Sequence, residues 1–226
     1  MVKDIIVIGS GSELAQEFVK LCKSRGISVN TISSSRKSLP DLYVKDYLLD
    51  QEKIASFVEN FRYPLVVFFN GYLKENRPKY YPTIEEIQKT FFINFKVPYV
   101  LTNKILKNKY AVKFIFISSI ASVRLRYKNY IYGLSKYLLE KNIKEDKNNL
   151  LFIKFGLIHT KMSKDHSKPP FSLDKEKAAL LIIENLDNFG VIFPTKELFL
   201  VSLFLKILPI KLVDKFEGLA INNKSN

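Results

Sequence analysis

Short apolar runs alternate with segments of helical periodicity along most of this chain. Strand-like runs cover 5–8, 27–32, 65–69, 114–117 and 150–153. Helical patterns begin near Ser12, follow Asp50, and cover 84–106 and 130–142. Continuous apolar runs are typical of strands buried on both faces, and strands that alternate with helices favour a parallel sheet. We therefore expect an α/β fold, with a doubly wound parallel sheet in three α/β/α layers.

The size and cysteine content of the chain fit one intracellular domain. Its 226 residues and 47% hydrophobic content are ordinary for a single α/β unit, and no repeat or linker interrupts the pattern. The apolar run before Gly9 is too short for a secretory signal. Cys22, as the lone cysteine, cannot form an internal disulfide, and with two histidines it cannot build a usual zinc site. We expect one domain over 1–226, no metal, and a cytoplasmic location.

The chain is basic, with a formal net charge of +14. Such a charge favours nucleic acid, an anionic membrane surface or a phosphorylated ligand as partner. Most of the excess is lysine spread along the chain, without the concentrated basic stripe and stacking aromatics of a nucleic-acid binder. We interpret the charge mainly as a solvated lysine-rich surface and expect no nucleic-acid partner.

The residues that follow each apolar run are the first place to look for chemistry. In open, Rossmann-like sheets, ligands bind outside the carboxyl ends of the strands. At these positions the sequence has Gly9 to Gly11, Ser33 to Arg36, Asn70-Gly71, Ser118-Ser119 and Gly156.

Gly9 and Gly11 follow a strand and open a helix. In this context, glycines let backbone amides and the helix N-terminus approach a pyrophosphate. The third small residue of the dinucleotide fingerprint is displaced, because Leu14 precedes Ala15. This segment alone is therefore equally compatible with a plain strand-to-helix turn.

A tyrosine and a lysine lie four residues apart in the segment from Tyr132 to Lys136. This spacing places both on one face of the expected helix. A phenol loses its proton near pH ~10, so a proton relay near neutrality needs a nearby cation such as Lys136. Ser119, just after a strand, can donate a hydrogen bond to a carbonyl oxygen, although serines there are commonly turn residues.

Taken in order, these motifs resemble the short-chain dehydrogenase/reductase family as far as about Met162. The resemblance rests on the glycine turn from Gly9 to Ala15, Asn70-Gly71, Asn94, Ser119, the Tyr132/Lys136 pair, and the segment from Phe155 to Met162. Glu13 and Ala15 stand where the family more often has glycine, and the family's proline before Gly156 is missing.

The resemblance implies hydride transfer between a nicotinamide and a carbonyl carbon. It implies that Tyr132 donates or accepts the proton, Ser119 orients the carbonyl oxygen, Lys136 lowers the tyrosine pKa and binds the ribose, and Asn94 holds a water. It also implies cofactor contacts at Gly9, Gly11, Ser12, Glu13, Leu14, Asn70, Gly71, Tyr132, Lys136, Gly156, Ile158 and Thr160.

The end of the second strand favours NADP(H) over NAD(H). An acidic residue that would bind the ribose of NAD is missing there. Ser35 and Arg36 stand in its place, within a run of serines, and can receive a 2′-phosphate through charge-assisted hydrogen bonds. A solvated turn with incidental charge is the alternative.

The C-terminal part, 163–226, contains an expected lid and an apolar segment. The lid, 163–172, is polar and holds Pro169-Pro170. The apolar segment, 198–210, is too short to span a bilayer comfortably. It can lie in a membrane interface, line a site for a lipid-linked substrate, or form a core or dimer helix.

These features together favour an NADPH-dependent carbonyl reductase acting on a small-molecule ketone, with a sugar or lipid-linked keto compound as one substrate class. Residues 1–162 would bind the cofactor and carry the catalytic groups. Two alternatives remain open: a nucleotide-sugar epimerase or dehydratase of the same family, and a non-catalytic NADP-binding regulator. Family resemblance also implies a homo-oligomer.

Overall fold

The centre of the molecule is a seven-stranded sheet. The computed structural model describes residues 4–74, 81–109, 111–143, 149–164, 169 and 171–213. The strand order is β3-β2-β1-β4-β5-β6-β9, and every neighbouring pair runs parallel. The strands are β1 (Ile5–Ile8), β2 (Val29–Ser33), β3 (Leu42–Tyr43), β4 (Leu65–Phe68), β5 (Lys113–Ser119), β6 (Leu150–Phe155) and β9 (Gly190–Ile192). The expected doubly wound parallel sheet is confirmed.

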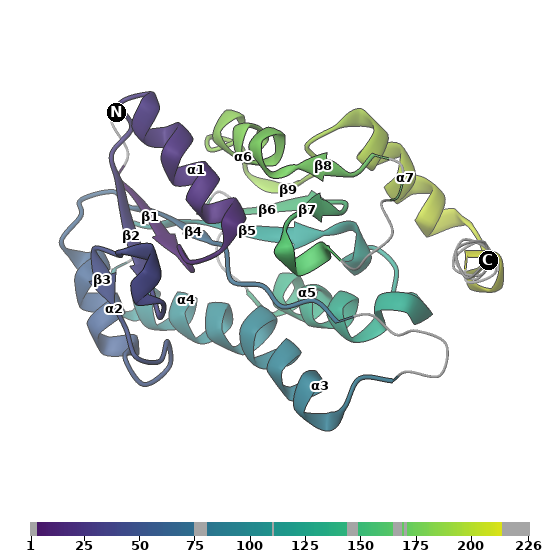
Figure 1. Ribbon diagram of the computed structural model, residues 1–226, viewed down its shortest axis with the longest axis horizontal. Coiled ribbons are helices and arrows are strands. Elements are labelled where there is room, and N and C mark those ends of the chain that lie inside the picture. Colours follow the sequence, from purple (N-terminus) through teal and green to yellow (C-terminus); the bar gives the residue numbers. More distant parts are fainter. Residues whose placement is uncertain are drawn as a thin grey trace.

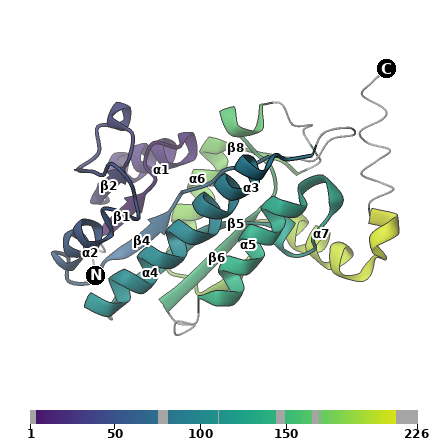
Figure 2. The same ribbon diagram turned by 90° about the horizontal axis from the view of Figure 1, so that it is seen from below.

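Helices cover both faces of this sheet, so the three-layer prediction is also confirmed. One face carries α1 (Glu13–Ser24) and α6 (Lys175–Glu184). The other carries α2 (Gln51–Glu59), α4 (Val97–Asn108) and α5 (Tyr130–Asn142) (Figures 1 and 2). The last described long helix, α7 (Lys196–Ile207), lies at one end of the molecule, near the small parallel pair β7 (Ile158–His159) and β8 (Leu173–Asp174).

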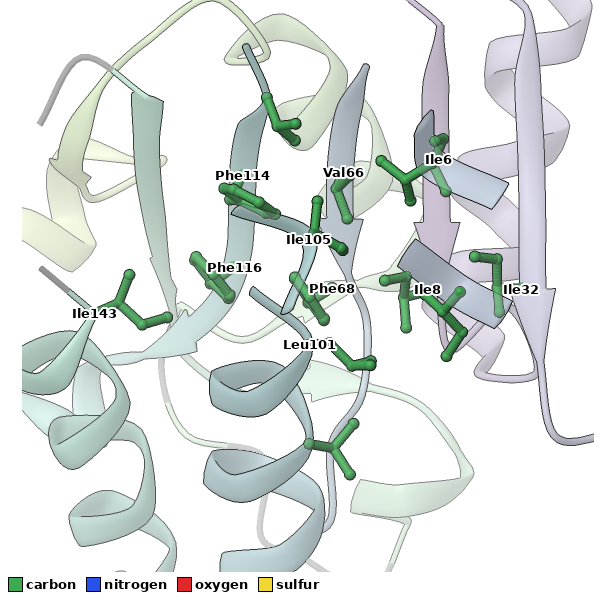
Figure 3. Close-up of a cluster of buried hydrophobic side chains, with 14 of the residues drawn as sticks. Ile6, Ile8, Ile32, Val66, Phe68, Leu101, Ile105, Phe114, Phe116 and Ile143 are labelled. Carbon is green, nitrogen blue, oxygen red and sulfur yellow. The ribbon is translucent and has the colours of Figure 1, made fainter. Parts of the chain in front are cut away.

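Alternate strand residues supply the two layers of the core. Ile5 and Val7 of β1 belong to the cluster shared with α1 and α6, whereas Ile6 and Ile8 belong to the cluster shared with α2 and α4. This alternation follows from the two-residue period of a strand and explains why the runs are apolar throughout. Figure 3 shows the second cluster, in which Phe114 and Phe116 of β5 lie beside Phe68 of β4.

Aromatic rings form a continuous ladder across three strands of this second cluster. The ring centroids of Phe68 and Phe116 are 5.0 Å apart, and those of Phe116 and Phe152 are 4.9 Å apart. Phe116 is almost completely buried between its two neighbours. Because β5 carries the expected catalytic serine at its end, this ladder also holds the strand that leads to the candidate site.

The long helix expected over 84–106 is interrupted. It consists of α3 (Ile84–Phe91), a π-helical turn η2 (Phe92–Lys96) and α4. The fully buried Asn94 lies in the π turn. Its Oδ1 accepts a hydrogen bond from the Tyr72 N–H, and its Nδ2 donates one to the Tyr72 carbonyl. These two bonds tie the turn to the segment that follows β4.

Replacing Phe116 with alanine should lower the free energy of unfolding by about 3–5 kcal/mol, because the change opens a cavity between two stacked rings. Urea unfolding followed by circular dichroism measures the loss. Phe204→Ala is the matched control, since Phe204 is largely exposed on α7 and its removal should cost little. Similar losses for the two variants would contradict the assigned role of the ladder.

Candidate active site

Two adjoining cavities open at the carboxyl ends of the central strands. The larger has a volume of about 860 Å³ and is lined from the ends of β1, β4, β5 and β6. The second, of about 720 Å³, lies over the ends of β1 and β2. Strand β1 pairs with β2 on one side and β4 on the other, so the strand order reverses here. Such a switch point is where open α/β sheets bind ligands.

Most of the residues singled out from the sequence line these cavities. Those around the larger cavity are Gly11, Ser12, Glu13, Leu14, Asn70, Gly71, Ser119, Tyr132, Lys136, Gly156, Ile158 and Thr160. Those around the second are Gly9, Gly11, Ser12, Ser35, Asn70 and Gly71. Asn94 and Arg36 line neither cavity.

The turn after β1 requires glycine at position 9. Gly9 has a φ of +86°, and a Cβ there would lie 3.0 Å from the backbone nitrogen of Asn70. The turn leads to Ser12, whose hydroxyl accepts a hydrogen bond from the Ala15 N–H at 3.2 Å and caps α1. The N-terminus of α1 thus faces the cavity with a backbone arrangement suited to an anion.

Glu13 occupies the first position of α1, close to where an anion would bind. Its carboxylate accepts a hydrogen bond of 2.6 Å from the Lys161 N–H, and Lys161 Nζ lies 3.8 Å from its other oxygen. The side chain that departs from the usual glycine therefore connects the turn after β1 to η6 (Lys161–Ser163). This contact directs the carboxylate toward a partner on another element.

Helix α5 approaches the end of β5 closely because residue 133 is glycine. A Cβ on Gly133 would lie 2.6 Å from the carbonyl oxygen of Ala121, in the short helix η3 (Ile120–Ser122) that continues β5. Any larger residue would force the two backbones apart. The glycine next to Tyr132 thus sets the distance between α5 and the strand that carries Ser119.

Tyr132 and Ser119 meet across this contact. Burial raises the pKa of Tyr132 to about 12, and a hydrogen bond with the Ser119 side chain opposes the rise. The Ser119 hydroxyl also accepts a bond from the Ala121 N–H at 3.2 Å. A phenol with this pKa stays protonated near neutrality. The shift is opposite to the lowering of the tyrosine pKa by Lys136 that the resemblance implies, because desolvation of the buried phenol dominates.

Lys136 lies one helical turn beyond Tyr132 and is almost fully buried. Its Nζ donates a hydrogen bond of 2.9 Å to the carbonyl of Ile117 and lies 5.9 Å from the centroid of the Tyr132 ring. Burial lowers the pKa of Lys136 to about 8, although the charge of Glu140 raises it in part. The tyrosine and lysine thus share one face of a helix, as predicted from their spacing.

Asn94 lies behind the cavity, where its side-chain amide is engaged by protein groups. Besides its bonds to Tyr72, Nδ2 donates to the Ser135 hydroxyl at 3.1 Å. Ser135 in turn donates to the Tyr132 carbonyl at 2.7 Å. Asn94 therefore connects the π turn to the helix that carries the tyrosine and lysine.

The second cavity contains a lysine that the sequence motifs did not indicate. Ser33, Ser34, Ser35 and Lys45 line it, and Lys45 lies just after β3. The guanidinium of Arg36 instead lies over the ring of Tyr43, with Cζ 4.8 Å from the centroid. Because β3 has only two residues, periodicity gave no sign that Lys45 would reach the end of β2.

The segment after β6 places Gly156, Ile158 and Thr160 along the larger cavity. His159 points its ring nitrogens to other partners, the Asp174 carboxylate at 2.8 Å and the Ser172 hydroxyl at 2.9 Å. Of the expected lid, 165–168 and 170 lie outside the described residues.

The rest of the larger cavity wall comes from α7 and from the loop before α5. Leu198 and Val201 of α7, together with Arg126 and Asn129 before α5, line it. Arg124 donates hydrogen bonds to the carbonyls of Leu205 and Lys206, and so ties the end of α7 to this same loop. The sequence offered the apolar 198–210 segment as one lining of a site, and two of its residues do line this cavity, whereas the loop before α5 carries no motif.

Comparisons with known proteins identify the fold. No family model and no curated protein matches this chain. Solved structures do. A short-chain dehydrogenase from Burkholderia cenocepacia in complex with NADP is 13% identical, with a TM-score of 0.73 over 92% of this chain and 98% of that chain. A short-chain dehydrogenase from Streptomyces avermitilis is 16% identical, with a TM-score of 0.68 over 99% and 96%.

A third structure, BdcA in complex with NADPH, is 13% identical, with a TM-score of 0.63 over 81% of this chain and 86% of that chain. The agreement extends over most of each chain, so the likeness is one of whole architecture. At such identities it establishes the fold.

Proposed function

We propose, from this short-chain dehydrogenase/reductase fold, that the protein is an NADP(H)-dependent oxidoreductase of that family and reduces a carbonyl group. The observation that carries the proposal is the meeting of Tyr132, Ser119 and Lys136 at one cavity. That cavity also reaches the turn after β1, so the proton donor and a dinucleotide would share one space.

The residues around the cavities fit a dinucleotide. The glycine turn leaves room for a backbone approach, and a Cβ at Gly9 would close it. The buried Oδ1 of Asn70, which lines both cavities, has no hydrogen-bond partner within the described protein. A buried acceptor without a partner costs free energy, so a donor on a bound ligand would relieve it.

The chain's own groups would handle the proton and the orientation of the substrate. Bound NADPH would supply the hydride. Tyr132, protonated near neutrality, would donate its proton to the carbonyl oxygen, while Ser119 would hold that oxygen by a hydrogen bond. Lys136, charged below its pKa of about 8, would stabilise the phenolate that remains and bind the ribose.

The preference for NADP(H) would come from the end of β2. The serines of the second cavity and the two cations near it suit a 2′-phosphate. Lys45 already lines the cavity. The Arg36 guanidinium would have to move off the Tyr43 ring, or contact the phosphate while it lies over that ring.

The substrate would be a keto compound with a polar and an apolar part, such as a keto sugar linked to a lipid. Arg126 and Asn129 give one side of the cavity a polar character, and Leu198 and Val201 give α7's side an apolar one. A homo-oligomer in the cytoplasm remains our expectation for its assembly and location.

The outer face of α7 supports a further proposal, that the protein binds an anionic membrane surface. Phe199, Leu200, Leu203, Phe204 and Ile207 are all exposed on this helix. Lys196 and Lys206 of the same helix, and Lys211 shortly after it, are exposed too. Apolar side chains flanked by lysines suit the interface of an anionic bilayer. In the described ranges, no helix is long and apolar enough to cross a membrane.

Tyr132→Phe should lower kcat for carbonyl reduction at least about a hundredfold while NADPH binding is retained, because only the proton donor is removed. NADPH oxidation over a panel of ketones and keto sugars, with binding followed by fluorescence, measures both. Tyr130→Phe, an exposed tyrosine of the same helix, is the control. Activity retained in Tyr132→Phe would refute the assigned chemistry. A wild-type protein that binds NADPH without turnover would favour the alternative of a non-catalytic NADP-binding regulator.

Arg36→Ala and Lys45→Ala should each reduce the preference for NADPH over NADH about tenfold, since each removes a cation from the 2′-phosphate. The ratio of the two dissociation constants is the measurement. Lys37→Ala, an exposed neighbour outside both cavities, controls for general charge. An unchanged ratio in the Arg36/Lys45 double variant would show that the 2′-phosphate lies elsewhere.

The full chain should float with vesicles of phosphatidylcholine and phosphatidylserine, and less with phosphatidylcholine alone. Phe204→Ser/Ile207→Ser should abolish flotation because it removes two exposed apolar groups from α7. Leu39→Ser/Leu49→Ser, which changes two still more exposed leucines elsewhere, should not. If the full chain does not float, and the α7 variant instead changes the oligomeric state, the helix binds a second copy.

A further inference from the structure

Three residues of α5, each one helical turn from the next, contact the end of β5. Tyr132 hydrogen-bonds with Ser119, Lys136 bonds to the Ile117 carbonyl, and Glu140 accepts a bond from the Ser118 hydroxyl at 2.5 Å. Three consecutive strand residues are thus held by one face of one helix. The first two helix residues belong to the proposed chemistry, whereas nothing so far accounts for Glu140.

Glu140 is the centre of a buried polar network. The same carboxylate oxygen lies 2.8 Å from the Ser122 hydroxyl, which is also 2.7 Å from the Ser119 carbonyl. The other oxygen pairs with Lys154 Nζ at 2.7 Å, and the two side chains are only 10% and 9% exposed. Glu140 therefore reaches both sides of Ser119, through Ser118 before it and Ser122 after it.

Lys154 is placed for this contact by the sheet. It lies in β6 directly opposite Ser118 of β5, so both side chains point to the α5 face. It is also the one charged residue of an otherwise apolar strand with the sequence LLFIKF. A lysine at a core position of a buried strand needs a partner, and the structure supplies Glu140.

Stability alone does not explain this ion pair. Removing two charges from water costs about as much as their attraction returns, and apolar residues of similar volume often stabilise a protein equally well. The network does, however, contact the segment around Ser119 and lies one turn from Lys136, so its position indicates a role in the site.

We propose that Glu140 is a positioning residue of the reaction centre: it holds the segment that carries Ser119 and places a carboxylate charge beside Lys136. This inference rests on the proposed function for its kinetic consequence. Glu140 lines neither cavity, so it acts through Ser118, Ser122 and Lys136 and not on the substrate.

The electrostatic part has a defined sign. Burial lowers the pKa of Lys136 and the charge of Glu140 raises it, so removal of that charge lowers the pKa further. Among the described residues, the titratable groups that face Lys136 are Tyr132 and Glu140 on its own helix and, beyond Glu140, Lys154 on β6. As the pH rises, a reaction that needs protonated Lys136 would then begin to slow at a lower pH than in the wild-type protein.

Glu140→Gln should move the alkaline limb of the kcat profile to lower pH by about one unit. NADPH binding and KM should change little, because the carboxylate does not line the cavities. Glu140→Asp, which keeps the charge, should restore much of the profile. Glu184→Gln, an exposed glutamate of α6, should leave it unchanged. A profile identical to wild type in Glu140→Gln would overturn the proposal.

A second variant guards against a folding defect. In Glu140→Leu/Lys154→Met, apolar groups of similar size replace the pair, so the fold should survive, and the alkaline limb should shift in the same direction. If the double variant is folded and its alkaline limb stays at the wild-type pH, Glu140 has no influence on Lys136 and the proposal is wrong.

The ionisation of Lys136 can also be followed without turnover. In the full-length protein labelled with ¹³C-lysine, the Lys136 Cε resonance is assigned by its loss in Lys136→Arg and titrated with pH. A lower midpoint in Glu140→Gln supports the proposal, and an equal midpoint refutes it. A wild type that reduces no carbonyl would refute only the proposed function, since this titration would still report on Glu140.

Discussion

The close approach of α5 to the end of β5 is the constraint on which the rest of the site depends. Because Gly133 has no side chain, the helix can lie against the carbonyl of Ala121. Only at that separation can three side chains of one helical face reach Ile117, Ser118 and Ser119 together. The aromatic ladder through Phe116 fixes the strand from within the core, and the π turn holds α5 through Asn94 and Ser135.

Burial gives the tyrosine and the lysine opposite pKa shifts that serve one purpose. Desolvation disfavours the charged form of each, so the tyrosine holds its proton more tightly and the lysine less. The lysine is left close to the pH at which it changes charge, and a neighbouring carboxylate opposes the loss of that charge. A buried site of this kind is sensitive to single charges that do not contact a ligand.

Much of the architecture follows from the sequence, because β1, β4, β5 and β6 contain apolar runs and segments of helical periodicity separate them. Helix α5 was predicted with its observed bounds, and α1 begins at Glu13, next to the Ser12 start predicted for it. Strands β3 and β9 were missed because two or three residues give no readable period. The π turn was missed since nothing in the local pattern distinguishes it from an α-helix.

The candidate site was predictable where motifs exist and not where geometry alone decides. Tyr132, Lys136 and Ser119 were indicated by their spacing and position together with the resemblance to a known family. Lys45, Arg126 and Glu140 could not be found in this way, because their roles depend on which strand ends and loops meet in space. Lys154 did leave a trace, since a lysine inside an apolar strand signals a buried partner.

The π turn also has a consequence for comparing this chain with others. Hydrogen bonds from residue i to i+5 accommodate one more residue than a regular helix of equal length. Positions in α3 and α4 that one continuous 3.6-residue period would place on the same face are therefore offset by about one residue. An alignment of this segment to an uninterrupted helix needs a one-residue gap near Asn94, and without that gap every position on one side of it would be assigned to the wrong face.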